Sequence, residues 1–274
     1  MRLATIRTTS GNRAVRIDSD HAVETGQEDV GALLREADWA EVAAGASGRA
    51  YPLSGIQYAP LIPRPGKIIC VGINYRAHIE EMGREVPTHP TLFAKYAEAL
   101  IGAQDDIILP AASTAMDWEA ELAVVVGRRA RNVDERGATA AIAGYTIIND
   151  VSARDWQYRT MQWLQGKTFE STCPLGPHLV TADEAGTGLE LRCLVDGETV
   201  QSANTSDMVF GPAATVSYAS QILTLNPGDV IALGTPGGVG HARKPPRYLQ
   251  DGTVLTTSVS GLGECVNVAR RAVP

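Results

Sequence analysis

The stretch MDWEAELAVVVG, residues Met116–Gly127, decides how the centre of this chain folds. It places Glu119 and Glu121 two residues apart and continues as the uncharged, β-branched segment Leu122–Val126. In a β-strand, residues i and i+2 point to the same side and lie roughly 6–7 Å apart. An isolated pair of this kind is usually solvated, whereas two carboxylates on a buried strand require a cation or a shared proton.

A third acid stands in similar surroundings. Asp150 ends the apolar segment GYTIIND, where a buried strand is expected to finish. Three carboxylates without a converging set of cysteines or histidines suit a hard divalent cation that prefers oxygen ligands. We therefore predict that Glu119, Glu121 and Asp150 bind Mg²⁺ or Mn²⁺, with Ca²⁺ as an alternative. Three protein ligands would leave open positions for a chelating substrate.

Composition and charge exclude several classes of protein. The 274 residues are 44% hydrophobic and carry a net charge of −7; this length and composition fit one large domain, or a large domain with a small appendage. The sequence contains no run rich in lysine or arginine, so nothing in it indicates binding to nucleic acid or to a membrane surface. Neither a signal peptide nor a run of roughly 20 apolar residues is evident. We expect a cytoplasmic protein that binds neither nucleic acid nor membranes.

The cysteines are scattered without a CxxC pair, which predicts reduced thiols in a reducing compartment. They are Cys70, Cys173, Cys193 and Cys265. Cys173 is the one to examine further, because it lies close in sequence to Lys167.

Local patterns predict a small N-terminal domain at residues 1–60 and a larger domain at residues 65–274. Alternating segments at Arg2–Arg7 and Ala14–Asp18, separated by turn residues, indicate a hairpin. Glu28–Ala44 has apolar residues at helical spacing.

The larger domain contains many strand patterns and few helix patterns. Strands are expected at Lys67–Gly72, Thr91–Lys95, Asp105–Leu109 and Gly144–Ile148. Helices are expected at Asn74–Gly83, Asp134–Ala143 and Ala214–Leu223, and a helix or irregular crossover at Ser152–Leu164. After Leu189, short β segments follow, with a hairpin turn at Asp196–Gly197. Together these patterns predict a β-rich α+β fold.

His78 and Glu81 form a second candidate group. At positions i and i+3 of a short helix, their side chains would be neighbours. A carboxylate beside an imidazole fixes its tautomer and raises its basicity, which is the arrangement of a general base. The alternative is an ion pair on the surface.

Lys167 and Gln157 form a third group. A lysine in a loop-like segment such as QGKTFESTCPLGP is usually solvated, but beside three acids it would stabilise a developing oxyanion. The glycine-rich turn Gly234–Gly240, GTPGGVG, follows a strand pattern and lacks the spacing of a phosphate loop. Its backbone amides and the Thr235 hydroxyl would approach a small anionic ligand closely. The alternative is a plain flexible turn.

Taken in chain order, these segments resemble the fumarylacetoacetate hydrolase family, from about residue 65 to the C-terminus. The motifs are GxNYxxHxxE at Gly72–Glu81, ExELAVVxG at Glu119–Gly127, NDxSARDxQ at Asn149–Gln157, GKTF at Gly166–Phe169 and GDVIxxGTPxGVG at Gly228–Gly240. The resemblance implies a rolled, mixed β-sheet domain that usually forms a homodimer. Cys70–Asn74 contains no acid, so the branch with three metal-binding carboxylates is the better match.

The resemblance also implies roles for individual residues. The metal ligands would be Glu119, Glu121 and Asp150; the pair that activates water would be His78 and Glu81; the oxyanion contacts would be Lys167 and Gln157. Thr235 would contact a 2-oxo or 1,3-dioxo acid, and we add Gly234, Arg154 and Lys95 to the predicted substrate-binding residues.

These roles favour a metal-dependent hydrolase that cleaves a carbon–carbon bond in an acylpyruvate or a similar substrate. The same metal–enolate chemistry serves isomerisation of 2-hydroxyhepta-2,4-diene-1,7-dioate, decarboxylation of oxaloacetate-type acids, and hydration. The residues leave these alternatives open. A protein of another class, which captures an oxo acid through the metal without turning it over, would need no general base.

Overall fold

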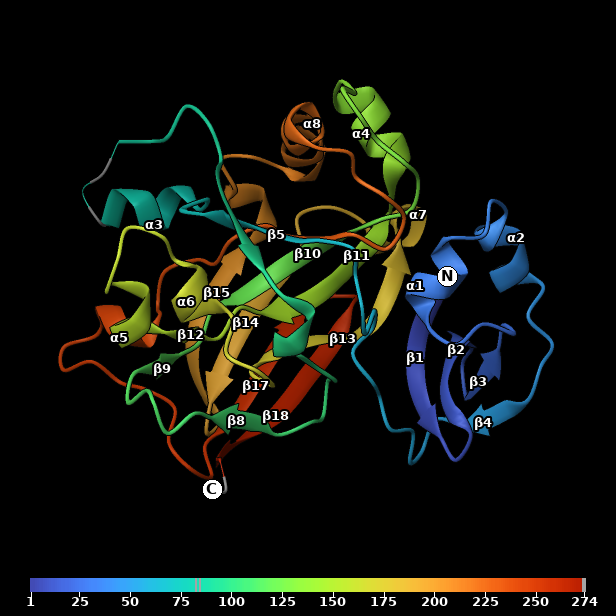
Figure 1. The fold of residues 1–274 in the computed structure, drawn as a ribbon, viewed down its shortest axis with the longest axis horizontal. Coiled ribbons are helices and arrows are strands. Elements are labelled where there is room, and N and C mark those ends of the chain that lie inside the picture. The colour runs from blue at the N-terminus through green and yellow to red at the C-terminus, as the bar shows by residue number, and fades with distance from the viewer. Residues whose placement is uncertain (82, 84, 273–274) are drawn as a thin grey trace.

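The computed structural model describes residues 1–81, 83 and 85–272, without the side chain of Glu81. Most of the chain forms β-sheets, and short helices lie around them (Figure 1). The sheets contain both parallel and antiparallel pairs, such as β16 with β5 and β10 with β11. The predicted β-rich α+β class is confirmed.

Within the described residues, the largest sheet has eleven strands. They are β1 (Arg2–Thr8), β2 (Gly11–Ile17), β3 (His21–Glu24), β4 (Ala50–Pro52), β5 (Ile68–Gly72), β6 (Thr91–Lys95), β7 (Leu100–Ile101), β10 (Ala120–Val126), β11 (Ile142–Asn149), β13 (Cys173–Thr181) and β16 (Val230–Ala232). A five-stranded sheet contains β8 (Ile107–Leu109), β14 (Glu190–Val195), β15 (Glu198–Asn204), β17 (Val254–Val259) and β18 (Gly263–Arg271). The short strands β9 (Met116–Asp117) and β12 (Ser152–Ala153) pair with each other.

The helices are short, apart from α8. They are α1 (Val30–Leu34), α2 (Trp39–Ala44), α3 (Arg76–Glu81), α4 (Glu135–Ala141), α5 (Arg154–Gln157), α6 (Leu164–Lys167), α7 (Ala182–Ala185) and α8 (Pro212–Ile222). Single 3₁₀ turns occur at Ala97–Ala99, Thr205–Asp207 and Gly240–Ala242. In the part of the chain that the structure describes, no helix combines the length and the apolar character needed to cross a bilayer.

Strand β10 lies inside the large sheet, between β11 and β16, and all its residues are buried. Leu122 and Val124 belong to one apolar cluster, and Ala123 and Val125 belong to another. Both faces of β10 are therefore covered, which explains why its sequence is continuously apolar instead of alternating.

Two local predictions need correction. The stretch Met116–Gly127 is not one strand, because Trp118 and Glu119 separate β9 from β10. The backbone N–H of Glu119 donates to the Asn149 side chain at 2.9 Å. The single helix expected at Glu28–Ala44 is two helices, and Asp38 begins the second in a non-helical conformation.

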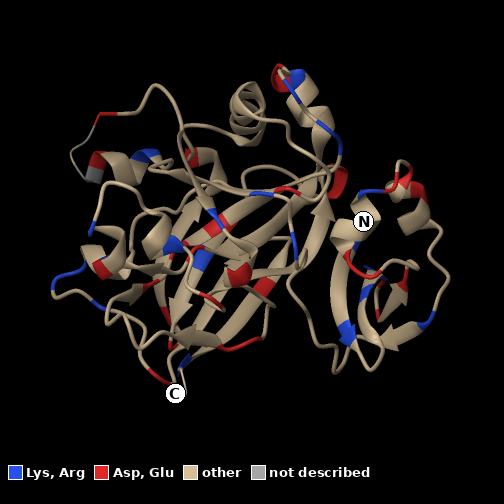
Figure 2. Ribbon diagram, in the orientation of Figure 1, with Lys and Arg blue, Asp and Glu red and all other residues tan. Residues whose placement is uncertain are grey.

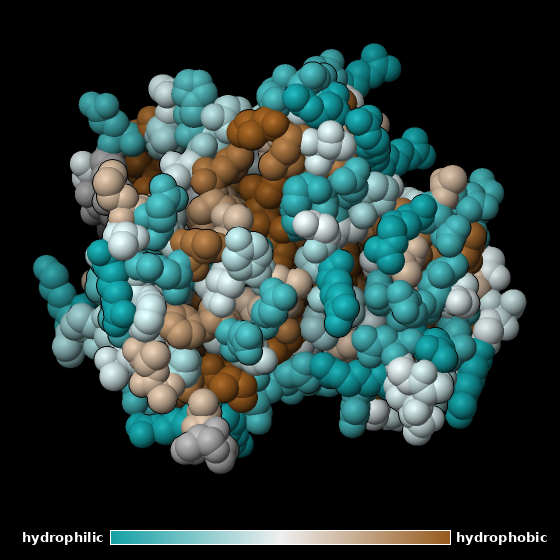
Figure 3. Space-filling view, viewed as in Figure 1, coloured by the Kyte–Doolittle hydropathy of each residue, from teal (hydrophilic) through white to brown (hydrophobic). Residues whose placement is uncertain are grey.

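The N-terminal hairpin is confirmed, since β1 and β2 pair along their whole length. β1 also pairs with β13, where Leu3 lies opposite Leu179, so β1–β4 extend the large sheet (right side of Figure 1). The visible surface of this part is mostly hydrophilic, whereas apolar side chains gather beneath α8 (Figure 3). A domain boundary between residues 60 and 65 stays a prediction.

Candidate active site

Three acids converge where β10 begins and β11 ends. Glu119, Glu121 and Asp150 are all buried, and one carboxylate oxygen from each lies within 4.8 Å of the others. The strand register explains this, because Ala120 lies opposite Asn149 and the N–H of Asp150 donates to the Glu119 carbonyl at 2.8 Å. Glu119 therefore reaches the cluster from just outside the strand that holds Glu121. Charged residues of both signs lie among the central strands in Figure 2.

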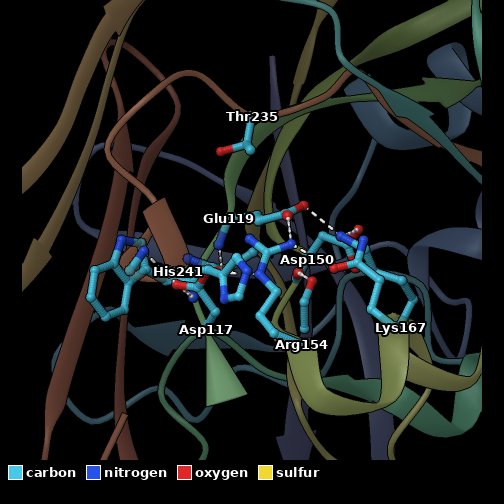
Figure 4. Close-up of polar contacts among 12 residues, drawn as sticks. Asp117, Glu119, Asp150, Arg154, Lys167, Thr235 and His241 are labelled. Carbon is cyan, nitrogen blue, oxygen red and sulfur yellow. Dashed lines mark hydrogen bonds and ion pairs between the residues drawn. The ribbon is translucent and has the colours of Figure 1, made fainter. Parts of the chain in front are cut away.

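Three buried cations surround these acids (Figure 4). Lys167 Nζ lies 2.6 Å from Glu119 Oε2 and 2.9 Å from Asp150 Oδ2. Lys95 Nζ lies 2.8 Å from Asp150 Oδ1, and Arg154 Nη1 lies 2.7 Å from Glu119 Oε1. Lys167 ends helix α6 with only 2% of its surface exposed, so the expectation of a loop lysine is wrong.

These ion pairs keep the groups charged despite their burial. Burial alone would raise the pKa of Asp150, but the charges of Lys167 and Lys95 hold that pKa below its usual value. Burial alone would lower the pKa of Lys167, but the charges of Asp150 and Glu119 raise it.

Glu121 differs from the other two acids. It accepts a hydrogen bond from the Gly234 N–H at 2.6 Å, and no lysine or arginine among the described residues forms an ion pair with it. Burial and the negative charges of Asp150 and Glu119 raise the pKa of Glu121 well above its usual value. A divalent cation would supply the missing positive charge, so this all-oxygen donor set fits a hard metal ion.

Asp117 is a buried residue of this site that the sequence reasoning missed. Its Oδ1 accepts the N–H groups of Trp118 at 2.8 Å and Gly240 at 2.7 Å. Its Oδ2 accepts from Arg154 Nε at 2.8 Å and from the His241 N–H at 3.0 Å. The available signal was the spacing of Asp117, Glu119 and Glu121 at every second residue.

A cavity of about 240 Å³ opens beside the acid cluster. The predicted residues that line it are His78, Glu119, Arg154, Gln157, Lys167 and Thr235. Helices α5 and α6 form one wall of the cavity. They pack so closely that a Cβ on Gly166 would lie 2.5 Å from the backbone nitrogen of Gln157. Only glycine allows this approach, which brings Lys167 next to Arg154.

The other predicted residues lie as follows. Gln157 Oε1 accepts from Arg154 Nη1 at 2.8 Å. Thr235 Oγ1 donates to the Ala120 carbonyl at 2.9 Å, which ties the glycine-rich turn to β10. Gly234 and Lys95 contact the acids rather than line this cavity, so a direct substrate contact for them stays a prediction.

His78 lies on α3, is half-buried and lines the cavity. The backbone of Glu81 is in the same helix, but its side chain lies outside the described residues. The water-activating pair therefore stays a prediction. All four cysteines are buried and free, and burial raises the pKa of Cys173 to about 12, so it is not a reactive thiol.

The model of the fumarylacetoacetate (FAA) hydrolase C-terminal domain matches residues 67–270. A mitochondrial oxaloacetate tautomerase, FAHD2A of Bos taurus, is 46% identical over 220 residues, which cover 79% of this chain and 70% of the relative.

Two solved structures are similar over nearly all of the chain. A 5-carboxymethyl-2-hydroxymuconate delta-isomerase from Mycobacterium smegmatis has a TM-score of 0.85 and 34% identity, covering 99% of this chain and 100% of the other. A maleylpyruvate hydrolase from Sphingobium sp. SYK-6, solved with manganese(II) and pyruvate, has a TM-score of 0.82 and 27% identity, covering 100% of both chains. The expected fold is thereby confirmed.

Proposed function

Because this chain belongs to the fumarylacetoacetate hydrolase family, we propose that it interconverts the enol and keto forms of a small 2-oxo acid, with a divalent metal as cofactor. Oxaloacetate is the first substrate to test, since the bovine relative is named for that reaction. The observation that carries the proposal is the cluster of Glu119, Glu121 and Asp150 beside a cavity that His78 and Lys167 also line.

The metal would be Mg²⁺ or Mn²⁺, with Ca²⁺ as an alternative, held by the three acids. Bound there, it supplies Lewis-acid polarisation of a carbonyl oxygen. The manganese and pyruvate of the Sphingobium hydrolase support a site of this kind. Glu121 would gain most from the ion, because it lacks the cationic partners of its neighbours.

The chain's own residues divide the remaining work. Arg154 and Lys167 place two positive charges at the cavity wall, where they bind the carboxylate and the oxygen that gains charge as the enol forms. His78 takes a proton from C3 of the keto acid and delivers it to the C2 oxygen, and the reverse transfer restores the ketone. No bond between heavy atoms breaks.

Cleavage of a carbon–carbon bond in an acylpyruvate is the second candidate. It is favoured by the position of His78 in the cavity, from which it would deprotonate water, and by the Sphingobium relative. Isomerisation, decarboxylation and hydration use the same site. A non-catalytic oxo-acid binding protein would leave the placement of His78 without a purpose.

One set of assays separates these activities. The protein is stripped with EDTA, reloaded with Mg²⁺, Mn²⁺ or Ca²⁺, and given enol-oxaloacetate while its ultraviolet absorbance is followed. We expect metal-dependent ketonisation without release of pyruvate. The His78→Ala variant should lose roughly 10²- to 10⁴-fold in rate while keeping metal affinity.

Other outcomes would replace the proposal. Release of pyruvate from acetylpyruvate without ketonisation of oxaloacetate would assign a hydrolase, and release of pyruvate from oxaloacetate would assign a decarboxylase. Binding of either acid without turnover would assign a binding protein. A homodimer and a cytoplasmic location stay predictions, which a sizing column and microscopy of the tagged chain would test.

A further inference from the structure

Apart from Glu121, the charged groups around the metal site form ion pairs with one another. The buried acids are Asp117, Glu119, Glu121 and Asp150, and the buried cations are Lys95, Arg154 and Lys167. Four acids against three cations leave one negative charge, which a divalent ion would turn into one positive charge. The floor of the cavity therefore suits a single substrate carboxylate, and a second carboxylate would need another partner.

His241 offers such a partner at the cavity wall. It lines the cavity, and in Figure 4 it lies on the opposite side of Arg154 from Lys167. Four described residues that line the cavity can carry a positive charge: His78, Arg154, Lys167 and His241. Arg154 and Lys167 pair with the buried acids, and we assign proton transfer to His78. The side chain of His241 contacts Tyr248 instead of an acid.

The exposed imidazole of His241 contacts two tyrosines. Its Nδ1 lies 2.9 Å from the Tyr248 hydroxyl. Its ring lies over Tyr158, another cavity-lining residue, with centroids 5.2 Å apart and planes tilted by 32°. With Nδ1 occupied by Tyr248, Nε2 is the ring nitrogen left to donate to a ligand, either in the cation or in the tautomer that accepts from the tyrosine.

Asp117 sets the distance between His241 and Arg154. Its Oδ2 accepts hydrogen bonds from both the backbone N–H of His241 and the Nε of Arg154. The turn itself has little freedom, because a Cβ on Gly240 would lie 1.9 Å from the Arg247 carbonyl oxygen. An arginine and a histidine are thus placed along the same wall, which preorganises two hydrogen-bond donors for a ligand with two separated anions.

We propose that His241 is a specificity-determining residue that binds the distal carboxylate of a dicarboxylic 2-oxo acid. This inference rests on the proposed function, because it assumes that the first carboxylate lies at the metal site, beside Arg154 and Lys167. The cavity volume of about 240 Å³ is below the roughly 300–1,000 Å³ of sites for drug-sized ligands, so it fits a short acid.

The test compares oxaloacetate with 2-oxobutanoate, which has the same chain length and a methyl group in place of the distal carboxylate. Binding to the Mn²⁺-loaded protein is measured by calorimetry. The wild type should bind oxaloacetate more tightly. In His241→Leu, oxaloacetate should bind roughly tenfold more weakly, the effect of losing one charge-assisted hydrogen bond, and 2-oxobutanoate should change less than about twofold.

Two further variants separate recognition from structure. His241→Gln retains an amide donor near the position of Nε2 and should recover part of the affinity for oxaloacetate alone. His21→Leu, an exposed residue on β3, is the matched control and should bind both acids as the wild type does. Circular dichroism and the affinity for Mn²⁺ should be unchanged in every variant.

The outcomes also separate this inference from the proposed function. If His241→Leu weakens both acids equally, or neither, His241 does not select the distal carboxylate. If the wild type binds neither acid in the presence of metal, the proposed function fails as well.

Discussion

The acid cluster is buried and the contact between His178 and Tyr58 is half-buried, yet the first holds charged groups and the second holds neutral ones. In the cluster, Asp150 stays ionised because two lysines contact it. At the other position, His178 Nε2 lies 3.2 Å from the Tyr58 hydroxyl, and the two rings meet edge to face at 5.5 Å. Burial, assisted by the positive charge of Arg2, lowers the pKa of His178 to about 4. This histidine is neutral at pH 7.

The difference separates two uses of buried polar groups. Tyr58 follows the N-terminal strands and His178 lies on β13, so their neutral contact joins segments that also meet through β1 and β13. Such a pair contributes to packing. Buried ion pairs, in contrast, add little net stability once desolvation is included. The acid cluster is therefore better explained by ligand binding, and substitutions in the two regions should have different consequences.

The largest effect is expected from Asp150→Asn, which removes the charge that both Lys95 and Lys167 contact. Affinity for Mn²⁺ should fall by more than the roughly 10- to 100-fold that outer-shell partners contribute. Leaving two buried lysines short of a partner should also destabilise the protein by about 3–5 kcal/mol. Calorimetric titration and urea unfolding measure the two losses.

Asp106→Asn is the matched control, because Asp106 is exposed and lies 3.8 Å from Arg270. It should change neither quantity. Metal binding by Asp150→Asn at wild-type affinity would show that the cluster is not the metal site, and the contrast between the two regions would no longer hold.

Lys167→Met should separate catalysis from metal binding inside the cluster. Loss of a preorganised positive charge typically lowers the rate by roughly 10²- to 10³-fold. Affinity for the metal should not decrease, because Lys167 occupies oxygens of Glu119 and Asp150 that are proposed ligands. Steady-state kinetics and calorimetry measure the two quantities, with the exposed Lys244→Met as a control. Unchanged turnover in Lys167→Met would remove this lysine from the mechanism.

Much of this site could be predicted from sequence, because its motifs are local. The spacing of Glu119 and Glu121 before an apolar run indicated a buried acid pair, and Asp150 ended a second apolar run. Strand β10 was evident because both its faces are covered, which leaves a continuous apolar pattern. Each of these signals comes from residues that are close together in the sequence.

The burial of Lys167 could not be predicted in the same way. Its partners are 48 and 17 residues away in the chain, and glycines and small residues around it indicated a loop. Asp117 was missed for a similar reason, since the groups it holds at Gly240 and His241 lie far along the chain. Contacts of this kind depend on how the strands assemble, which local patterns do not encode.

The contact at His178 predicts how stability depends on pH. Between pH 6.5 and about 4 the unfolded chain binds a proton at this histidine and the folded chain does not, so stability falls as the pH is lowered through this window. At roughly 1.4 kcal/mol per pKa unit, the loss is about 3 kcal/mol by pH 4. Urea unfolding at several pH values should show this slope, reduced in His178→Phe. An unchanged slope in that variant would mean that His178 is protonated in the folded state.

Tyr58→Phe should have the smallest effect, and it sharpens the contrast most. It removes the hydrogen bond between the Tyr58 hydroxyl and His178 while keeping the aromatic ring, so the free energy of unfolding should fall by about 1 kcal/mol. Because the partial burial of His178 is unchanged and still disfavours its protonated form, the pH slope should persist. Turnover and metal affinity should match the wild type, since this contact supports packing alone. A change in catalytic rate without a change in stability would instead couple the N-terminal strands to the acid cluster, and the two regions would then act as one.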